Sequence, residues 1–118
     1  MINHGKNIIV EKSFRFALKI VITCELLEEK RKFIISRQLL KSGTSIGANI
    51  REAQGAETKA DFIHKIKIAF KEAGETEYWI LICLNSQNMQ IDEDLLDELT
   101  EIKKILSKII STAKSTNK

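Results

Sequence analysis

The chain contains no proline in 118 residues and only five glycines. Because proline interrupts helices and marks the turns of many strand-rich folds, its absence favours long unbroken helices and disfavours loop-rich, sandwich and collagen-like folds. A chain of this length corresponds to one domain, and it can bury a core without metal or disulfide staples. The first expectation is therefore a single domain built from long helices.

Apolar residues recur every three or four positions through four segments, which is the period of a helix and not of a strand. Gly55 follows the second segment, as a helix-ending C′ residue does. Thr58 and Asp61 have the spacing of a capping box at the start of the third segment, and Asp92 suits the N-cap of the fourth. Helices with short connections pack against their neighbours in turn. We therefore predict an all-α, antiparallel up-down-up-down four-helix bundle, with helices at about residues 11–29, 34–54, 59–84 and 92–114.

The first helix is apolar over more of its circumference than a surface helix needs. Two lines of apolar side chains run beside each other along it, and Ile22 and Leu26 widen the apolar surface further. This width is typical of a helix that is buried on two sides, inside the bundle and against another subunit. Large amphipathic rings also favour interfaces. The candidate oligomer interface comprises Phe14, Phe16, Ile22, Leu26, Tyr78 and Trp79.

The second helix carries Gly43 and Gly47, which are four residues apart and therefore on one face. Two glycines inside a helix cost about 1 kcal/mol each relative to alanine, so we expect them to allow a close approach of another backbone. Phosphate-binding loops instead place glycines before a helix, with a lysine after them. Neither condition holds here.

Polar side chains lie beside the apolar lines of the second and third helices, and buried polar groups need partners. We expect Asn49 to share a network with Glu72 or Glu75, and we interpret this network as structural, fixing the register of the two helices. Its predicted members are Gln38, Ser42, Ser45, Asn49, Glu52, Glu72 and Glu75.

The net charge is only +3, but the two signs are unevenly distributed. Residues 1–71 hold 14 Lys and Arg against 7 Asp and Glu, whereas residues 72–118 hold 5 against 9. A ring repeats any basic patch in every subunit, so several phosphate contacts add. No base-reading motif is present, and we expect no sequence specificity. The candidate nucleic-acid-binding residues are Lys30, Arg31, Lys32, Arg37, Lys41, Arg51, Lys67 and Lys71.

The histidines and cysteines offer little for catalysis. Di-iron bundles need two Glu-x-x-His helices, and only Asp61 to His64 has an acid three residues before a histidine. No arginine precedes His4 or His64 at the spacing of helical ribonucleases of the nucleotide-binding type. Neither cysteine has an obvious histidine partner. Cys24 and Cys83 lie in apolar helical patterns, and we expect them to be buried free thiols in a reducing cytoplasm.

Two pairs of acids leave a hydrolase open as a minor alternative. Glu72 with Glu75 and Asp94 with Asp97 are one helical turn apart, as are the magnesium-binding carboxylates of all-helical nucleotide pyrophosphatases. The stronger account of the acids at the start of the fourth helix is that they complement its dipole. We assign no catalytic residue, metal or cofactor.

The sequence contains no stretch of 18 apolar residues, so we predict no membrane span. The polar start of the chain is unlike a signal peptide.

Two ordered blocks carry a resemblance to a known family. The run QLLKSGTSIGANI at residues 38–50, followed by Glu52 and Ala53, resembles the signature of the 23S rRNA intervening-sequence proteins, also labelled S23 ribosomal protein. A second block at residues 61–79 resembles that family's next motif. The resemblance covers residues 12–85, and the fourth helix follows it only as a pattern.

The resemblance implies an up-down four-helix bundle that assembles as a ring, commonly a homopentamer, with no established enzymatic activity. A distant relative, the accessory protein of diversity-generating retroelements, is a pentameric bundle that binds nucleic acid and a reverse transcriptase, but this chain shows no close match to it. Our leading hypothesis is a non-enzymatic homo-oligomeric scaffold that binds RNA or DNA. The alternatives are a scaffold for a protein partner without nucleic acid and a magnesium-dependent hydrolase.

Overall fold

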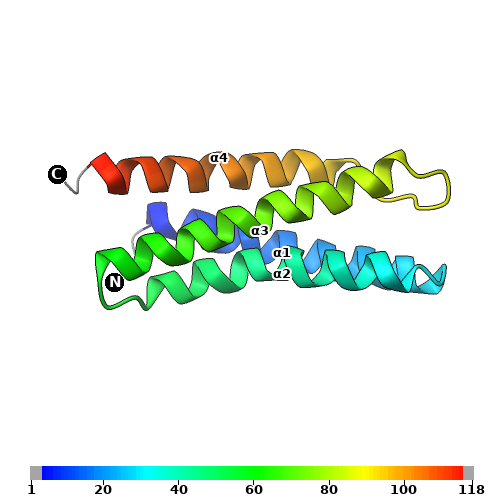
Figure 1. Cartoon of the computed structure of the whole chain (residues 1–118), viewed down its shortest axis with the longest axis horizontal. Coiled ribbons are helices and arrows are strands. Elements are labelled where there is room, and N and C mark those ends of the chain that lie inside the picture. The colour runs from blue at the N-terminus through cyan, green and yellow to red at the C-terminus, as the bar shows by residue number, and fades with distance from the viewer. Residues whose placement is uncertain (1–3, 116–118) are drawn as a thin grey trace.

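The computed structural model describes the backbone of residues 4–115 and the side chains of residues 8–115. Four helices form an elongated bundle of 49 × 24 × 21 Å (Figure 1). Their bounds are α1 His4–Glu29, α2 Phe33–Gln54, α3 Lys59–Asn85 and α4 Asp94–Ser115. Within the described residues there is no strand, and the predicted all-α class is confirmed.

The helices follow one another around the bundle in an up-down-up-down order, as predicted (Figure 1). α2 packs against α1 and α3, and α4 packs against α3 and α1. α1 and α3 are therefore diagonal partners that do not pack on each other. The outward faces of α1 and α3 therefore lie on opposite sides of the molecule.

A single core runs between the four helices. Its largest fully buried side chains are Phe16 and a set of isoleucines and leucines contributed by every helix. Burying this much apolar surface from residues spaced at helical period is the main stabilising term of the fold. The fully buried large residues are Phe16, Ile9, Ile20, Leu27, Leu39, Ile46, Ile50, Ile66, Ile80, Leu95, Leu99 and Ile102.

The start of α1 differs from the prediction. The helix begins at His4, whereas the pattern predicted a start near residue 11. Ile9 explains the difference, because it is 1% exposed and continues the core line through Ser13, Phe16 and Ile20. The polar residues before it obscure this periodicity in the sequence. α4 begins at Asp94, two residues after the predicted start.

Side chains cap the later helices where the sequence predicted. The Thr58 hydroxyl accepts a hydrogen bond from the Asp61 backbone N–H at 3.0 Å, at the N-terminus of α3. The Asp92 carboxylate accepts one from the Asp94 N–H at 2.9 Å, ahead of α4. These bonds satisfy donors that have no partner inside the helix.

The turn between α1 and α2 uses Arg31 where a glycine is usual. Arg31 has φ of 63°, and it is the one described non-glycine residue with a positive φ. Its N–H donates to the Glu28 carbonyl at 2.8 Å, and the Lys32 N–H donates to the Leu27 carbonyl at 2.9 Å. Gly55 ends α2 with φ of −97°, so it closes the helix without the left-handed conformation.

Gly43 brings α2 close to α1, as expected. A Cβ atom at Gly43 would lie 2.9 Å from both Cγ1 and Cγ2 of Ile20. At Gly47, a Cβ would lie 3.4 Å from the backbone oxygen and the hydroxyl of Ser13. The expected close approach therefore lies within the bundle, between α1 and α2. Gly74 on α3 has open space around it.

We predict that Arg31→Gly raises the free energy of unfolding by about 1 kcal/mol. The left-handed conformation costs a non-glycine residue roughly 1–2 kcal/mol, and the larger entropy of glycine in the unfolded chain offsets part of the gain. Urea unfolding followed by circular dichroism measures the change. A loss of stability would show that the Arg31 side chain makes contacts that outweigh its backbone strain.

Alanine at three glycines gives a matched series. Gly43→Ala should lower stability by about 1–2 kcal/mol, because Ile20 is branched at Cβ and cannot move its methyl groups away cheaply. Gly74→Ala should raise stability by up to about 1 kcal/mol through helix propensity alone. Gly47→Ala should fall between them. Equal effects at all three positions in urea unfolding would contradict the close approach of α1 and α2 at Gly43.

Candidate assembly and nucleic-acid-binding surfaces

An apolar stripe runs along the outward face of α1. Each of its five residues keeps between a third and three fifths of its surface exposed. An exposed stripe of this length is unusual on a monomer and marks an interaction surface. We call it the α1 stripe, and it consists of Phe14, Leu18, Val21, Ile22 and Leu26.

One member of the predicted oligomer interface was placed wrongly. Phe16 is 0% exposed and lies in the core, whereas Phe14 is 52% exposed on the α1 stripe. Residues two apart on a helix point in nearly opposite directions, so only one of the two phenylalanines can face outward. Ile22, Leu26 and Phe14 are accessible for assembly, and Phe16 is not.

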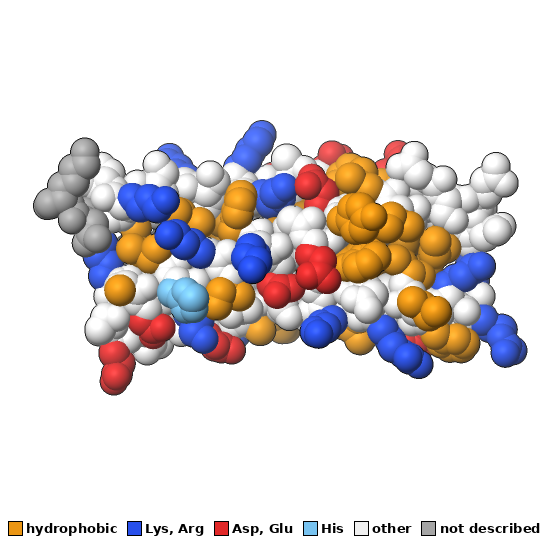
Figure 2. All heavy atoms as spheres, in the orientation of Figure 1, with side chains coloured by type: hydrophobic (Ala, Val, Ile, Leu, Met, Phe, Trp, Pro, Cys, Tyr) orange, Lys and Arg blue, Asp and Glu red, His pale blue; other side chains and the backbone are white. Residues whose placement is uncertain are grey.

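A second apolar surface lies on the outward face of α3. Tyr78 and Leu81 are exposed there, and Figure 2 shows hydrophobic side chains gathered over the second half of this helix. The rings of Tyr78 and Trp79 pack edge to face with centroids 5.3 Å apart. Trp79 is half-buried, and its Nε1–H donates to the Glu75 carboxylate at 3.1 Å. We call Tyr78 and Leu81 the α3 patch.

The polar link between α2 and α3 forms through the predicted Ser42, but its partner is Thr76 and the expected bridge from Asn49 does not form. The hydroxyls of Ser42 and Thr76 are hydrogen-bonded at 2.9 Å, and both side chains are fully buried. The Thr76 hydroxyl is also within 2.7 Å of the Glu72 carbonyl oxygen. Asn49 instead donates to the Ser45 carbonyl of its own helix at 2.9 Å.

The other predicted members of this network lie nearer the surface. Gln38 is exposed, Ser45 donates to the Lys41 carbonyl, and Glu75 binds Trp79. Glu52 does join α2 to α3, through an ion pair with Lys65 at 2.9 Å. The sequence pattern located the right helix faces. The predicted members did not include Thr76, which also continues the apolar line of α3.

Both cysteines are free and buried, as expected. The Cys24 thiol donates to the Ser36 carbonyl at 3.3 Å, and the Ser36 hydroxyl donates to the Cys24 carbonyl at 3.2 Å. Burial raises the pKa of the Cys24 thiol and the pKa of the Cys83 thiol. Thiols of this kind stay protonated and unreactive, so Cys24 serves packing between α1 and α2.

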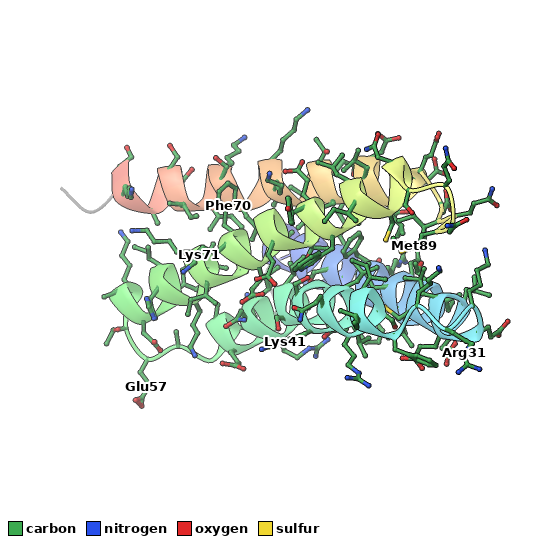
Figure 3. All side chains as sticks on the ribbon, turned by 45° about the vertical axis from the view of Figure 1, so that its right-hand side comes forward. Arg31, Lys41, Glu57, Phe70, Lys71 and Met89 are labelled. Carbon is green, nitrogen blue, oxygen red and sulfur yellow. The ribbon has the colours of Figure 1, made fainter. Side chains whose placement is uncertain are left out.

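The eight predicted basic residues fall into three groups on different parts of the bundle. Lys30, Arg31 and Lys32 lie in the turn between α1 and α2, and Figure 3 shows Arg31 and Glu57 at opposite ends of the molecule. Arg37, Lys41 and Arg51 form a row on the exposed side of α2. Lys67 and Lys71 lie exposed on α3. The structure does not bring the eight together as one surface.

Three further exposed lysines lie on the half of α4 that ends at the same end of the bundle as the first half of α3 (Figure 1). Six acids lie between residues 92 and 101, four of them in α4, and from residue 102 to 115 the helix holds four lysines and no acid. Counting charge over residues 72–118 conceals this division. Since α4 runs antiparallel to α3, its basic half lies at the same end of the bundle as the basic half of α3. The missed residues are Lys104, Lys108 and Lys114.

Some basic side chains on the described surface form ion pairs, and others do not. Lys12 and Lys19 of α1 pair with Glu101 and Glu98 of α4, and Lys103 pairs with Glu77 of α3 at 3.0 Å. Within residues 8–115, none of the eight predicted basic residues takes part in an ion pair. Their charge is available to a phosphate.

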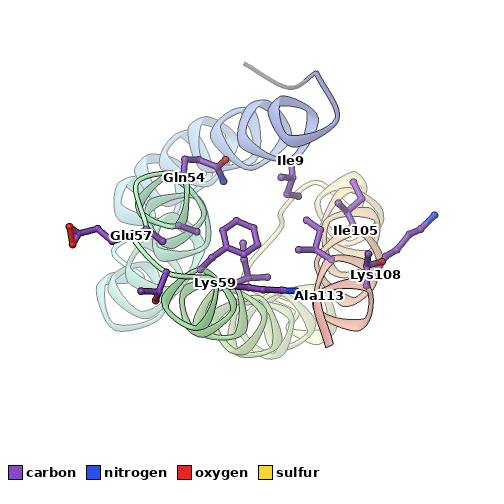
Figure 4. A pocket seen from close by; sticks show the side chains of 14 residues that line it. Ile9, Gln54, Glu57, Lys59, Ile105, Lys108 and Ala113 are labelled. Carbon is purple, nitrogen blue, oxygen red and sulfur yellow. The ribbon is translucent and has the colours of Figure 1, made fainter. Parts of the chain in front are cut away.

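One cavity of about 750 Å³ opens at the end of the bundle that holds the turn between α2 and α3, and all four helices line it (Figure 4). Ile9 and Ile105 point into it, Lys59 reaches across toward Ala113, and Lys108 points away into solvent. Its walls are mainly apolar. Among the described residues, no group of three or more His, Cys, Asp or Glu side chains is placed to hold a metal ion.

The buried hydroxyl pair gives a test of the α2–α3 link. Thr76→Val should lower the free energy of unfolding by about 1–3 kcal/mol, because it leaves the Ser42 hydroxyl buried without this partner. Adding Ser42→Ala should recover part of that loss, since both polar groups are then removed. Urea unfolding of the two single variants and the double variant measures the coupling. Strictly additive losses would show that the two hydroxyls do not stabilise each other.

No helix in the described part of the chain has the length and apolar character needed to cross a membrane.

The family described as 23S rRNA-intervening sequence protein matches residues 5–108. Among solved structures, the chain is similar to a protein of unknown function from the S23 ribosomal protein family of Bacteroides thetaiotaomicron VPI-5482, with 44% identity and a TM-score of 0.85. The alignment covers 91% of this chain and 98% of that chain. No curated protein matches. The chain therefore belongs to the 23S rRNA intervening-sequence protein family.

Proposed function

We propose that this protein is a non-enzymatic homo-oligomeric scaffold in the cytoplasm that binds RNA or DNA through its basic surface. The observation that carries the proposal is the α1 stripe, an exposed apolar surface that self-assembly would bury. The buried free thiols suit a reducing compartment.

A ring is the assembly that the two apolar surfaces favour. The α1 stripe and the α3 patch differ in composition and lie on diagonal helices, so they face away from each other. Contact between two different surfaces is head-to-tail, and such contacts close into rings when the rotation allows. The pentameric state is the expectation that the family resemblance adds.

The proposal of nucleic-acid binding rests on exposed basic side chains and on their repetition in each subunit of a ring. The candidate lysines and arginines are free of ion pairs within the described surface, and each copy in a ring presents the same set. Several weak phosphate contacts on one assembly bind with high avidity. Contacts of this kind hold the backbone and do not read bases.

A protein partner without nucleic acid is the second candidate. The α3 patch and the exposed Ile34 of α2, which keeps 80% of its surface, offer apolar contacts beyond the α1 stripe. Pull-down from a nuclease-treated lysate separates this candidate from the first. A stoichiometric protein retained after nuclease, with no binding of purified protein to RNA or DNA, favours it.

We predict that Leu18→Glu with Ile22→Glu reduces the assembly to monomers without unfolding the bundle. Both side chains are about half exposed, and burying two carboxylates in an apolar interface is costly. Light scattering gives the mass, and circular dichroism reports the fold. Ile34→Glu on α2 is the matched control and should keep the mass of the unmodified protein. A folded double variant with unchanged mass would show that the α1 stripe is not an assembly interface.

The same variants test the link between assembly and binding. In a mobility-shift assay at low salt, the nuclease-treated unmodified protein should shift labelled RNA or DNA, and raising the salt should abolish the shift. The monomeric variant should bind at least about tenfold more weakly, because it loses avidity. No shift at low salt by a confirmed oligomer would contradict the proposed function.

A further inference from the structure

The fold creates a basic surface that the order of residues along the chain conceals. Lys67 and Lys71 lie on the first half of α3, and three lysines lie on the second half of α4. All five are exposed, and Figure 2 shows Lys and Arg side chains gathered over this part of the molecule. We call this surface the α3–α4 lysine face, and it consists of Lys67, Lys71, Lys104, Lys108 and Lys114.

We propose that the α3–α4 lysine face, and not the basic row on α2, is the surface that contacts nucleic-acid phosphates. The inference rests on the proposed function and adds the place of binding to it. It also assigns a role to three lysines of α4, which belong to a part of the sequence that is acidic in total.

An ion pair joins α3 to α4 next to these lysines. Lys103 of α4 binds Glu77 of α3 at 3.0 Å, and its Nζ lies 5.9 Å from the centre of the Phe70 ring. From that point the two antiparallel helices continue toward the same end of the bundle, α3 by the chain before Phe70 and α4 by the chain after Lys103 (Figure 1). The basic halves of both helices therefore lie at one end of the molecule.

None of the five lysines of this face takes part in an ion pair within the described surface. Lys104 interacts electrostatically with Glu101, which itself pairs with Lys12. α4 carries no acid from residue 102 to residue 115, and Asp61 is the one acid of α3 between residues 59 and 71. From Lys104 to Lys114 the face extends about 15 Å along α4. That length passes about four phosphates of one strand in a B-form duplex.

The basic row on α2 lies near groups that make it a poorer binding site for phosphate. The Arg51 guanidinium lies 5.9 Å from the centre of the Phe14 ring, so it adjoins the α1 stripe. Glu28 of α1 accepts a hydrogen bond from Ser36, which directly precedes Arg37. Assembly through the α1 stripe would place Arg51 at the edge of the buried interface.

The α3–α4 lysine face also remains compatible with assembly. The α3 patch lies on the second half of α3, at Tyr78 and Leu81, whereas the lysines of that helix lie on its first half. The α1 stripe lies on the diagonal helix. A ring built through these two surfaces can therefore present the lysines of every subunit to one nucleic acid.

Charge reversal on two faces tests the inference. Lys67→Glu with Lys104→Glu changes the α3–α4 lysine face, and Arg37→Glu with Lys41→Glu changes the net charge by the same amount on α2. A labelled RNA hairpin and a DNA duplex of the same sequence are the probes, titrated at several salt concentrations. Light scattering and thermal melting confirm that each variant is folded and assembled. Lys67→Arg with Lys104→Arg keeps the charge and should bind like the unmodified protein.

We expect the α3–α4 variant to bind about ten- to a hundredfold more weakly at low salt, and its slope of log affinity against log salt to fall by about two per engaged subunit. The α2 variant should stay within about threefold of the unmodified protein. Equal losses in both variants, or a loss confined to the α2 variant, would overturn the location while leaving the proposed function in place. Failure of the unmodified assembly to bind either probe would instead overturn the proposed function itself.

Discussion

The close contact between α1 and α2 at Gly43 is the constraint on which the rest of the structure depends. Because Gly43 has no side chain, Ile20 fits against the α2 backbone, and Phe16 and Cys24 turn into the core with it. The opposite side of α1 is then left outside with its second line of apolar residues. A wide apolar helix packed this closely on one side must find another surface for the other side.

The helices can be predicted from the periodicity of the sequence, but which of their faces are exposed depends on how the helices pack. Four helices, their order and the caps at Thr58 and Asp92 could be predicted, since period and capping are local properties. The start of α1 at His4 is not predicted, because polar residues precede the buried Ile9 and hide the helical period. Phe16 was assigned outward because a helix buried on two sides shows apolar residues all round, and the pattern alone does not say which line faces the core.

The candidate site could be predicted only in part, for a related reason. Asn49 was expected to bridge α2 and α3, but a helical amide can bond its own preceding turn, and the buried Ser42–Thr76 pair makes the link instead. The basic surface depends on which segments fold beside one another. Lys104 follows six acids in the sequence, and the antiparallel return of α4 separates it from them and places it near α3.

We propose that assembly uses the outward faces of α1 and α3, and that phosphate binds the lysines of α3 and α4. Lysine acetylation of the assembled protein, with and without bound RNA and read by mass spectrometry, tests this proposal most directly. We expect RNA to protect Lys67, Lys71, Lys104 and Lys108 while Lys41 on α2 stays reactive. Protection of Lys30 and Lys41, with the lysines of α3 and α4 still fully reactive, would contradict it.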